Sequence, residues 1–177
     1  MELALVGRDS VFGVAAALDG GIALTDAAVL LSGTASILDA AVLRAAAERS
    51  AALRALLARH EQCLAAQAQQ AAACNASHSV EARLSRWLLC ACDLTKSESL
   101  PLTQECRAQM IGVQRNAVSI VANALQKASI ISYSRGQIEI TNVAALRETA
   151  CECYEAVKAR RDRLLKPSEG RSSIADG

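Results

Sequence analysis

The spacing of apolar positions changes along the chain and predicts which element each stretch forms. As far as Gly33, short apolar runs alternate with turns such as Gly7–Ser10 and Gly20–Gly21, which predicts short strands. After Gly33, apolar residues recur at spacings of three and four, as on one face of a helix. Between residues 130 and 140 the period falls to two. We therefore expect a mainly α fold with a small β component.

Two helices are predicted before the middle of the chain. The first covers 36–49, opened by Ser36 with Asp39 three residues later, and Ser50 caps a second, longer helix. The second helix has a narrow apolar stripe, which favours pairing with a second copy of the chain, although packing on the chain's own core is the alternative. The predicted dimerisation residues are Leu53, Leu57, Leu64, Ala68 and Ala71. A break at 75–79 marks a hinge.

Two further helices joined by a tight turn are predicted between Leu102 and Ile130. Thr103 is a good N-cap for the first, and Gly112 supplies an unusual backbone conformation at the turn. The second helix begins near Gln114 and turns Val118, Val121, Ala122 and Leu125 towards the core. Its outer side carries Arg115, Asn116, Ser119, Ile120, Asn123 and Lys127. Such a face suits entry into a DNA major groove, and a solvated helix surface is the alternative.

A β-hairpin is predicted directly after this helix. One strand covers 130–133, the turn covers 134–137, and the return strand covers 138–140. A hairpin in this position is the wing of a winged helix-turn-helix. Arg135 at its tip is placed to bind a phosphate, and Ser134 can assist.

The remaining segments complete the C-terminal half. Ser79 caps a helix whose buried face includes Trp87, the only tryptophan. A loop is expected over 96–101, and a single final helix over 143–165 with Asn142 as its cap. The residues from Pro167 onward are expected to be a disordered tail.

Charge is distributed unevenly along the chain. Residues 1–78 carry five arginines and seven acidic residues, a net charge of −2. Residues 79–166 carry thirteen basic and nine acidic residues, a net charge of +4. The half with the predicted groove-binding helix is therefore the positive one, as phosphate binding requires.

The cysteine usage predicts no metal or cofactor site. Seven cysteines are an odd number without the spacing of a disulfide framework, which indicates a reducing compartment. Two pairs, Cys90–Cys92 and Cys151–Cys153, would lie about 200° apart on a helix, so neither pair could bind one ion. Cys74 and His78 would share a face only if their segment is helical, which Asn75 and Ser77 argue against.

The sequence gives little support for a membrane protein, a secreted protein or an enzyme. The chain has no apolar run of membrane-spanning length and no secretory signal, so a cytoplasmic protein is expected. Only two histidines occur, with no phosphate-cradling loop or nucleophile elbow, so we do not expect an enzyme. A dimeric interaction module that does not bind DNA is the stronger alternative. Such a scaffold would not need the polar outer face at Arg115, Asn116 and Ser119.

The order of these motifs resembles one family. The run LTQECRAQMIGVQRNAVSIVANALQ, followed by ISYSRGQIEIT and CECY, resembles the C-terminal DNA-binding domain of the Crp/Fnr family of bacterial transcription regulators. Upstream, CNASHSVEARLSRWLLCACD resembles the linker and first helix of that domain. The resemblance implies double-stranded DNA with a palindromic operator as the ligand, a homodimer, and RNA polymerase as a further partner.

The same resemblance implies a division of the chain. Residues 1–49 would be a remnant of the β-roll sensor domain with a short helix, and 50–78 the dimerisation helix and hinge. Residues 79–166 would be the winged helix-turn-helix, and 167–177 the tail. Most of the roll that precedes this segment in the family is absent, so the sequence leaves open whether Met1 is the true start.

Particular residues are implied for base recognition. Arg115 matches the family's arginine at the start of the recognition helix and can bind guanine O6 and N7. Asn116 favours adenine, and Ile120 either contacts a thymine methyl group or makes no contact with DNA. The cyclic-nucleotide cassette of the family pairs Arg with a small hydroxyl residue, but here Thr25 follows Leu24, so cyclic-nucleotide binding is not expected. The effector, the operator sequence and the direction of regulation stay open.

Overall fold

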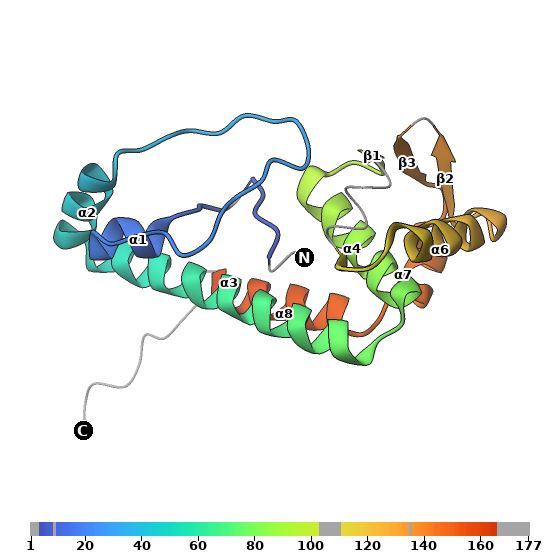
Figure 1. Ribbon diagram of the computed structural model, residues 1–177. Coiled ribbons are helices and arrows are strands. Elements are labelled where there is room, and N and C mark those ends of the chain that lie inside the picture. Colours follow the sequence, from blue (N-terminus) through green and yellow to red (C-terminus); the bar gives the residue numbers. More distant parts are fainter. Residues whose placement is uncertain (1–3, 9, 103–110, 135, 166–177) are drawn as a thin grey trace, which may run out of the picture.

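The protein is described here from a computed structural model, which covers residues 4–8, 10–102, 111–134 and 136–165 (Figure 1). The helices are α1 (Val14–Asp19), α2 (Ala40–Arg49), α3 (Ala51–Ser77), α4 (Val80–Thr95), α6 (Arg115–Lys127), α7 (Val143–Thr149) and α8 (Cys153–Leu165). The strands are β1 (Ser99–Pro101), β2 (Ile131–Ser134) and β3 (Gln137–Ile140). The predicted class, mainly α with a small β component, is confirmed.

The three strands form one antiparallel sheet in the order β1-β3-β2. The predicted hairpin is confirmed, with Ile131 opposite Ile140, and Gly136 takes a φ of 81° in its turn. The predicted loop over 96–101 is wrong in part, because β1 pairs with β3 and places Leu100 opposite Ile138. Three residues ending in proline carry no strand pattern of their own, so only the partner strand makes this segment a strand.

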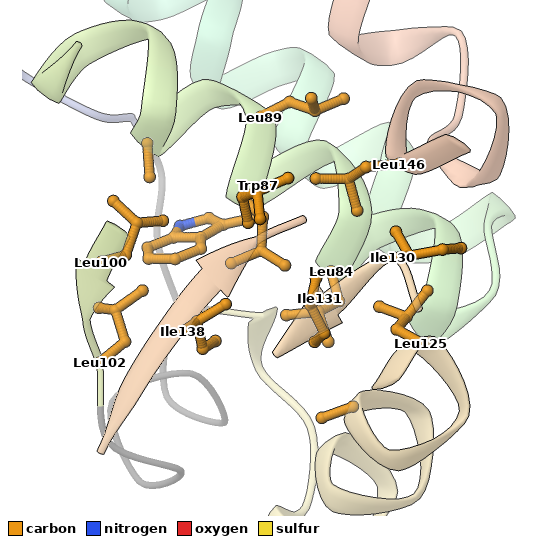
Figure 2. Close-up of a cluster of buried hydrophobic side chains, with 14 of the residues drawn as sticks. Leu84, Trp87, Leu89, Leu100, Leu102, Leu125, Ile130, Ile131, Ile138 and Leu146 are labelled. Atoms are coloured by element: carbon orange, nitrogen blue, oxygen red, sulfur yellow. The ribbon is translucent and has the colours of Figure 1, made fainter. Parts of the chain in front are cut away.

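The main core fills the space between α4, α6, α7 and the sheet (Figure 2). Trp87 is only 2% exposed and lies between α4 and the strands (Figure 2). The predicted buried face of α4 is confirmed at Leu84, Trp87, Leu88 and Ala91. Aromatic residues are scarce, so branched aliphatic side chains supply most of the remaining buried area: Leu89, Leu100, Leu102, Ile111, Val118, Leu125, Ile130, Ile131, Ile138, Ile140 and Leu146.

The long helix α3 is longer than predicted. Ser50 caps it as expected, since its Oγ accepts from the Leu53 amide at 3.2 Å. The predicted break at Asn75 is wrong: α3 continues to Ser77, and Ser79 then caps α4 with an Oγ bond to the Ala82 amide at 3.2 Å. A strong cap at the next helix therefore decided the boundary, rather than the lower helix propensity of Asn and Ser.

The cap predicted for the preceding helix is also wrong. Helix α2 begins at Ala40, and Asp39 is its N-cap, with Oδ1 accepting from the Ala41 amide at 2.7 Å. Ser36 lies in irregular chain before the helix. Both residues are good caps, and the carboxylate nearer to the alanine-rich run is the one used.

The N-terminal segment does not form the predicted strands. Residues 4–8 and 10–39 contain no strand, and 14–19 form the short helix α1, which has glycines with left-handed backbone on both sides, Gly13 (φ 85°) and Gly20 (φ 70°). The prediction of a β-roll remnant in these described residues is therefore wrong. Short apolar runs become strands only where other strands can pair with them, and none is present here.

This segment instead packs against α2 and α3. Val14, Ala47 and Leu57 form a small buried cluster. The Arg44 guanidinium donates to the Ala17 carbonyl at 3.0 and 3.1 Å, and the Val11 amide donates to Nε2 of the buried His60 at 3.3 Å. One end of α3 is thereby covered by the chain's own N-terminal part.

The predicted final helix is broken into two. Asn142 caps α7 as expected, but α7 ends at Thr149 and α8 begins at Cys153. The break lets α8 return alongside α3, which one continuous helix could not do (Figure 1). Tyr154 anchors the return, because it is buried and its hydroxyl donates to Oδ2 of Asp93 on α4 at 2.8 Å.

A matched pair of substitutions on α6 tests this core. Leu125 is 1% exposed and Ile120 is 71% exposed. We expect Leu125→Ala to lower the free energy of unfolding by about 2–5 kcal/mol, because it opens a cavity in the core. Ile120→Ala should change the free energy of unfolding by no more than about 0.5 kcal/mol. Urea unfolding followed by the fluorescence of Trp87 measures both, and equal losses would contradict the assigned faces of α6.

Candidate nucleic-acid interface

Helix α6 presents two chemically different sides. Its core side is confirmed, with Val118, Ala122 and Leu125 buried and Val121 partly buried. The predicted outer side faces away from the core. Its exposed residues are Arg115, Asn116, Ile120, Asn123 and Lys127; Ser119 is half-exposed, and Gln114 before the helix is exposed. The outer side is therefore accessible to a ligand along its full length.

The functional groups on this side are of three kinds. Arg115 and Lys127 are cationic, at the first and last positions of the helix. Asn116 and Asn123 supply amides that can both donate and accept hydrogen bonds. The Ser119 hydroxyl donates to the Arg115 carbonyl at 3.0 Å, so it offers a partner its oxygen lone pairs rather than its proton.

The turn before α6 is held by a buried arginine. Gly112 has a φ of 63°, which confirms the predicted need for glycine at this turn. Arg83 on α4 is 7% exposed and donates to the carbonyl of Ile111. The start of α6 is thus tied to α4 through a charged hydrogen bond. Thr103 and the helix predicted before the turn lie outside the described residues.

The hairpin β2–β3 is attached to α6 by a side chain. The Tyr133 amide donates to Oε1 of Gln126 at 3.0 Å, and the backbone amide of Ile130 donates to the carbonyl of Leu125 at 3.0 Å. Ser134 is exposed at the end of β2, as the wing prediction requires. Arg135, the predicted phosphate ligand, lies outside the described residues.

The predicted dimerisation residues differ in how far the chain itself buries them. Leu57 and Ala71 are buried in the chain itself, and Leu53 packs with the cluster of α1 and α2. Leu64 and Ala68 are half-buried. Leu53, Leu57 and Ala71 thus contact or are covered by the chain's own residues, which is the alternative that the sequence had left open.

Three cysteines lie together at the C-terminal end of α3, although the sequence did not predict that they would meet. Cys74, Cys151 and Cys153 form a small buried cluster, and His78 lies beside them. Cys151 is in the break between α7 and α8, so the assumption that Cys151 and Cys153 share a helix is wrong. Burial raises the pKa of Cys74, and burial together with Cys74 raises the pKa of Cys151 to about 12.

Comparisons with known proteins agree with this geometry. Residues 82–149 match the Crp-like helix-turn-helix domain. A protein from Eubacterium rectale assigned to the Crp/Fnr family of transcriptional regulators has a similar structure, with a TM-score of 0.52 and 18% identity over 64% of this chain and 52% of that one. FixK2 from Bradyrhizobium japonicum is similar with a TM-score of 0.58 and 15% identity, over 64% of this chain and 60% of FixK2. No curated protein matches the chain.

The match defines the class of one domain of the chain. The range that matches the Crp-like helix-turn-helix domain, 82–149, includes helix α6 and the hairpin β2–β3. The likeness to these two structures shows the fold, and the chain spans between about half and three fifths of their length. No helix among the described residues is both long and apolar enough to cross a membrane.

The attachment of the wing can be tested directly. We expect Gln126→Ala to speed hydrogen exchange at the Tyr133 amide, because that amide loses its side-chain acceptor. The free energy of unfolding should fall by only about 0.5–1 kcal/mol, since the bond is solvent-exposed. Lys127→Ala is the control on the next residue of the helix. Unchanged exchange at Tyr133 in Gln126→Ala would show that the bond does not hold the wing.

Proposed function

We propose that the protein is a sequence-specific DNA-binding transcription regulator of the Crp/Fnr type, with α6 as the helix that enters the major groove. One observation carries this proposal: the side of α6 away from the core is polar, exposed and cationic at its N-terminal residue, and a hairpin follows it directly. A major groove admits one helix and offers hydrogen-bonding groups on each base pair. The exposed arginine and amides are the side chains that read those groups.

The roles of individual residues follow from their chemistry. Arg115 would donate two hydrogen bonds to guanine O6 and N7, and Asn116 would pair with adenine. Ile120, at 71% exposure, offers an apolar surface to a thymine methyl group. Asn123 and Lys127 lie further along the helix, and Ser134 and Arg135 on the wing would bind phosphates. Contact with RNA polymerase stays a prediction from the resemblance.

Selection from random DNA followed by titration tests base reading. Arg115→Ala should cost about 1–3 kcal/mol on the selected operator and relax the preference at one base position. Arg49→Ala removes the same charge from an exposed site at the end of α2 and is the matched control, with unchanged specificity. Measurements at two salt concentrations separate the phosphate contribution.

The outcomes distinguish the alternatives. A uniform loss with all sequences in Arg115→Ala would show that this residue binds phosphate rather than a base. Absence of any preferred sequence in the wild type, with the protein folded, would favour the dimeric interaction module that does not bind DNA.

We further propose that two copies pair through α3, using a face different from the predicted leucine stripe. Seven of the exposed positions of α3 recur at alternating spacings of three and four: Ala55, Ala58, Gln62, Ala65, Gln69, Ala72 and Ala76. This is the spacing of a coiled-coil seam, and the small side chains allow close approach of two helices. The seam lies opposite the side of α3 that carries Cys63, Cys74 and other buried residues.

Sedimentation measures this pairing. Ala65→Arg places a long charged side chain in the middle of the seam and should convert a dimer to a monomer. Ala52→Arg changes an exposed residue away from the seam and should leave the dimer intact. A dimer that survives Ala65→Arg would exclude this face as the interface.

A further inference from the structure

Four side chains with metal-binding groups converge where α3 meets the start of α8. Cys74 and His78 come from the last turn and C-cap of α3, Cys151 from the α7–α8 break, and Cys153 from the first position of α8. One ligand atom from each lies within 4.8 Å of all the others. The three cysteines are buried and His78 is partly exposed. Residues far apart in sequence thus meet at one point.

Two of the separations are close to those around a single tetrahedral ion. Sγ of Cys74 and Sγ of Cys151 are 3.5 Å apart, and Sγ of Cys153 is 3.7 Å from Nδ1 of His78. With zinc bonds of about 2.3 Å to sulfur and 2.0–2.1 Å to nitrogen, tetrahedral edges are about 3.8 Å between sulfurs and 3.6 Å between sulfur and nitrogen. Only small adjustments would therefore bring all four atoms onto one ion.

The surroundings also resemble those of a metal site. While Nδ1 of His78 faces the sulfurs, its Nε2 is 3.1 Å from Oε1 of Glu152, as in sites where a carboxylate orients a ligating histidine. The Gln70 side-chain amide donates to Sγ of Cys153 at 3.0 Å, which suits a thiolate acceptor. The positive charge of Arg86 acts on Cys74 and would partly balance three thiolates bound to one divalent ion.

We propose that Cys74, His78, Cys151 and Cys153 form a structural site for one thiophilic divalent ion of the zinc type. Three cysteines and one histidine are a common ligand set of closed zinc sites. No position is left for water or substrate, so the ion's role is to hold segments together. It joins the end of the long helix to the return of the chain after the DNA-binding domain.

The same geometry weighs against two other uses of these residues. A disulfide between Cys74 and Cys151 would employ two of the four groups and leave the convergence of His78 and Cys153 unexplained. An iron–sulfur cluster with two irons separates the ligands of one iron from those of the other, whereas all four atoms here lie within 4.8 Å. One ion uses every group in the cluster.

The site has a structural consequence for the whole chain. Helix α3 ends at Ser77 with His78 as its C-cap, and α4 begins two residues after His78. An ion bound at this point would restrict the angle between α3 and that domain. Loss of the ion would release the restriction.

Metal analysis of the full chain tests the proposal. Protein purified under reducing conditions, given Zn²⁺ and dialysed should retain about one Zn²⁺ per chain by mass spectrometry, the stoichiometry of a four-ligand site. Cys151→Ser should lose it, while Cys92→Ser, a cysteine on α4 outside the cluster, should retain it. With Co²⁺ instead, the wild type should show the sulfur-to-cobalt charge-transfer absorption and intense visible bands of a tetrahedral site.

A second set of variants keeps the proposal testable if Cys151→Ser does not fold. His78→Cys preserves four ligands and should still bind one ion, whereas His78→Ala should bind more weakly. A chelator should lower the Tm of the wild type and of Cys92→Ser. Zinc content and Tm that are the same in the wild type and in His78→Ala would overturn the proposal. Protein that retains no metal under reducing conditions, and that forms a Cys74–Cys151 disulfide in air once the reductant is removed, would also overturn it.

Discussion

The burial of Trp87 against the small sheet is the contact on which the candidate interface depends. Trp87 comes from α4, Leu100 from β1 and Ile138 from β3, and all three are at most 2% exposed (Figure 2). The same core receives Leu125 from the inner side of α6. Because protein cores are close-packed, fixing these side chains also fixes the direction in which the opposite side of α6 faces. Rigid packing beneath the helix thus provides the surface that a DNA ligand would need.

Two polar contacts add to the apolar core in fixing the position of α6. Arg83 ties the turn before α6 to α4, and Gln126 ties β2 to the end of α6. A buried arginine is tolerated only when it is paired, and the Ile111 carbonyl gives it one partner. Polar side chains therefore hold both ends of α6, in addition to the apolar contacts of its inner side.

Helix α3 is covered by two separate parts of the chain. Helix α3 is too long to be buried by α1 and α2 alone, and α8 returns to cover part of the remainder. Tyr154 holds that return, and burial together with the nearby Asp93 carboxylate raises its pKa to about 12. The reversal before α8 also brings Cys151 and Cys153 to Cys74 and His78. The same reversal of the chain therefore packs α8 against α3 and brings the three cysteines and His78 together.

The sequence by itself determined the elements whose signals are local. The apolar faces of α4 and α6, the caps at Ser50, Ser79 and Asn142, and the hairpin turn are all set by neighbours along the chain. Much of the candidate interface belongs to this group, because the outer residues of α6 follow once its inner stripe is known.

Only the tertiary structure decided the features that need distant partners. Strand β1 exists because β3 pairs with it, and Leu53 and Leu57 of α3 face the chain's own residues because α1 and α2 lie against them. The N-terminal apolar runs, without strands to pair with, form a short helix and irregular chain instead. The cysteine cluster depends on a break after α7 that helical periodicity does not indicate. Each of these outcomes rests on contacts between residues far apart in sequence, which no local pattern records.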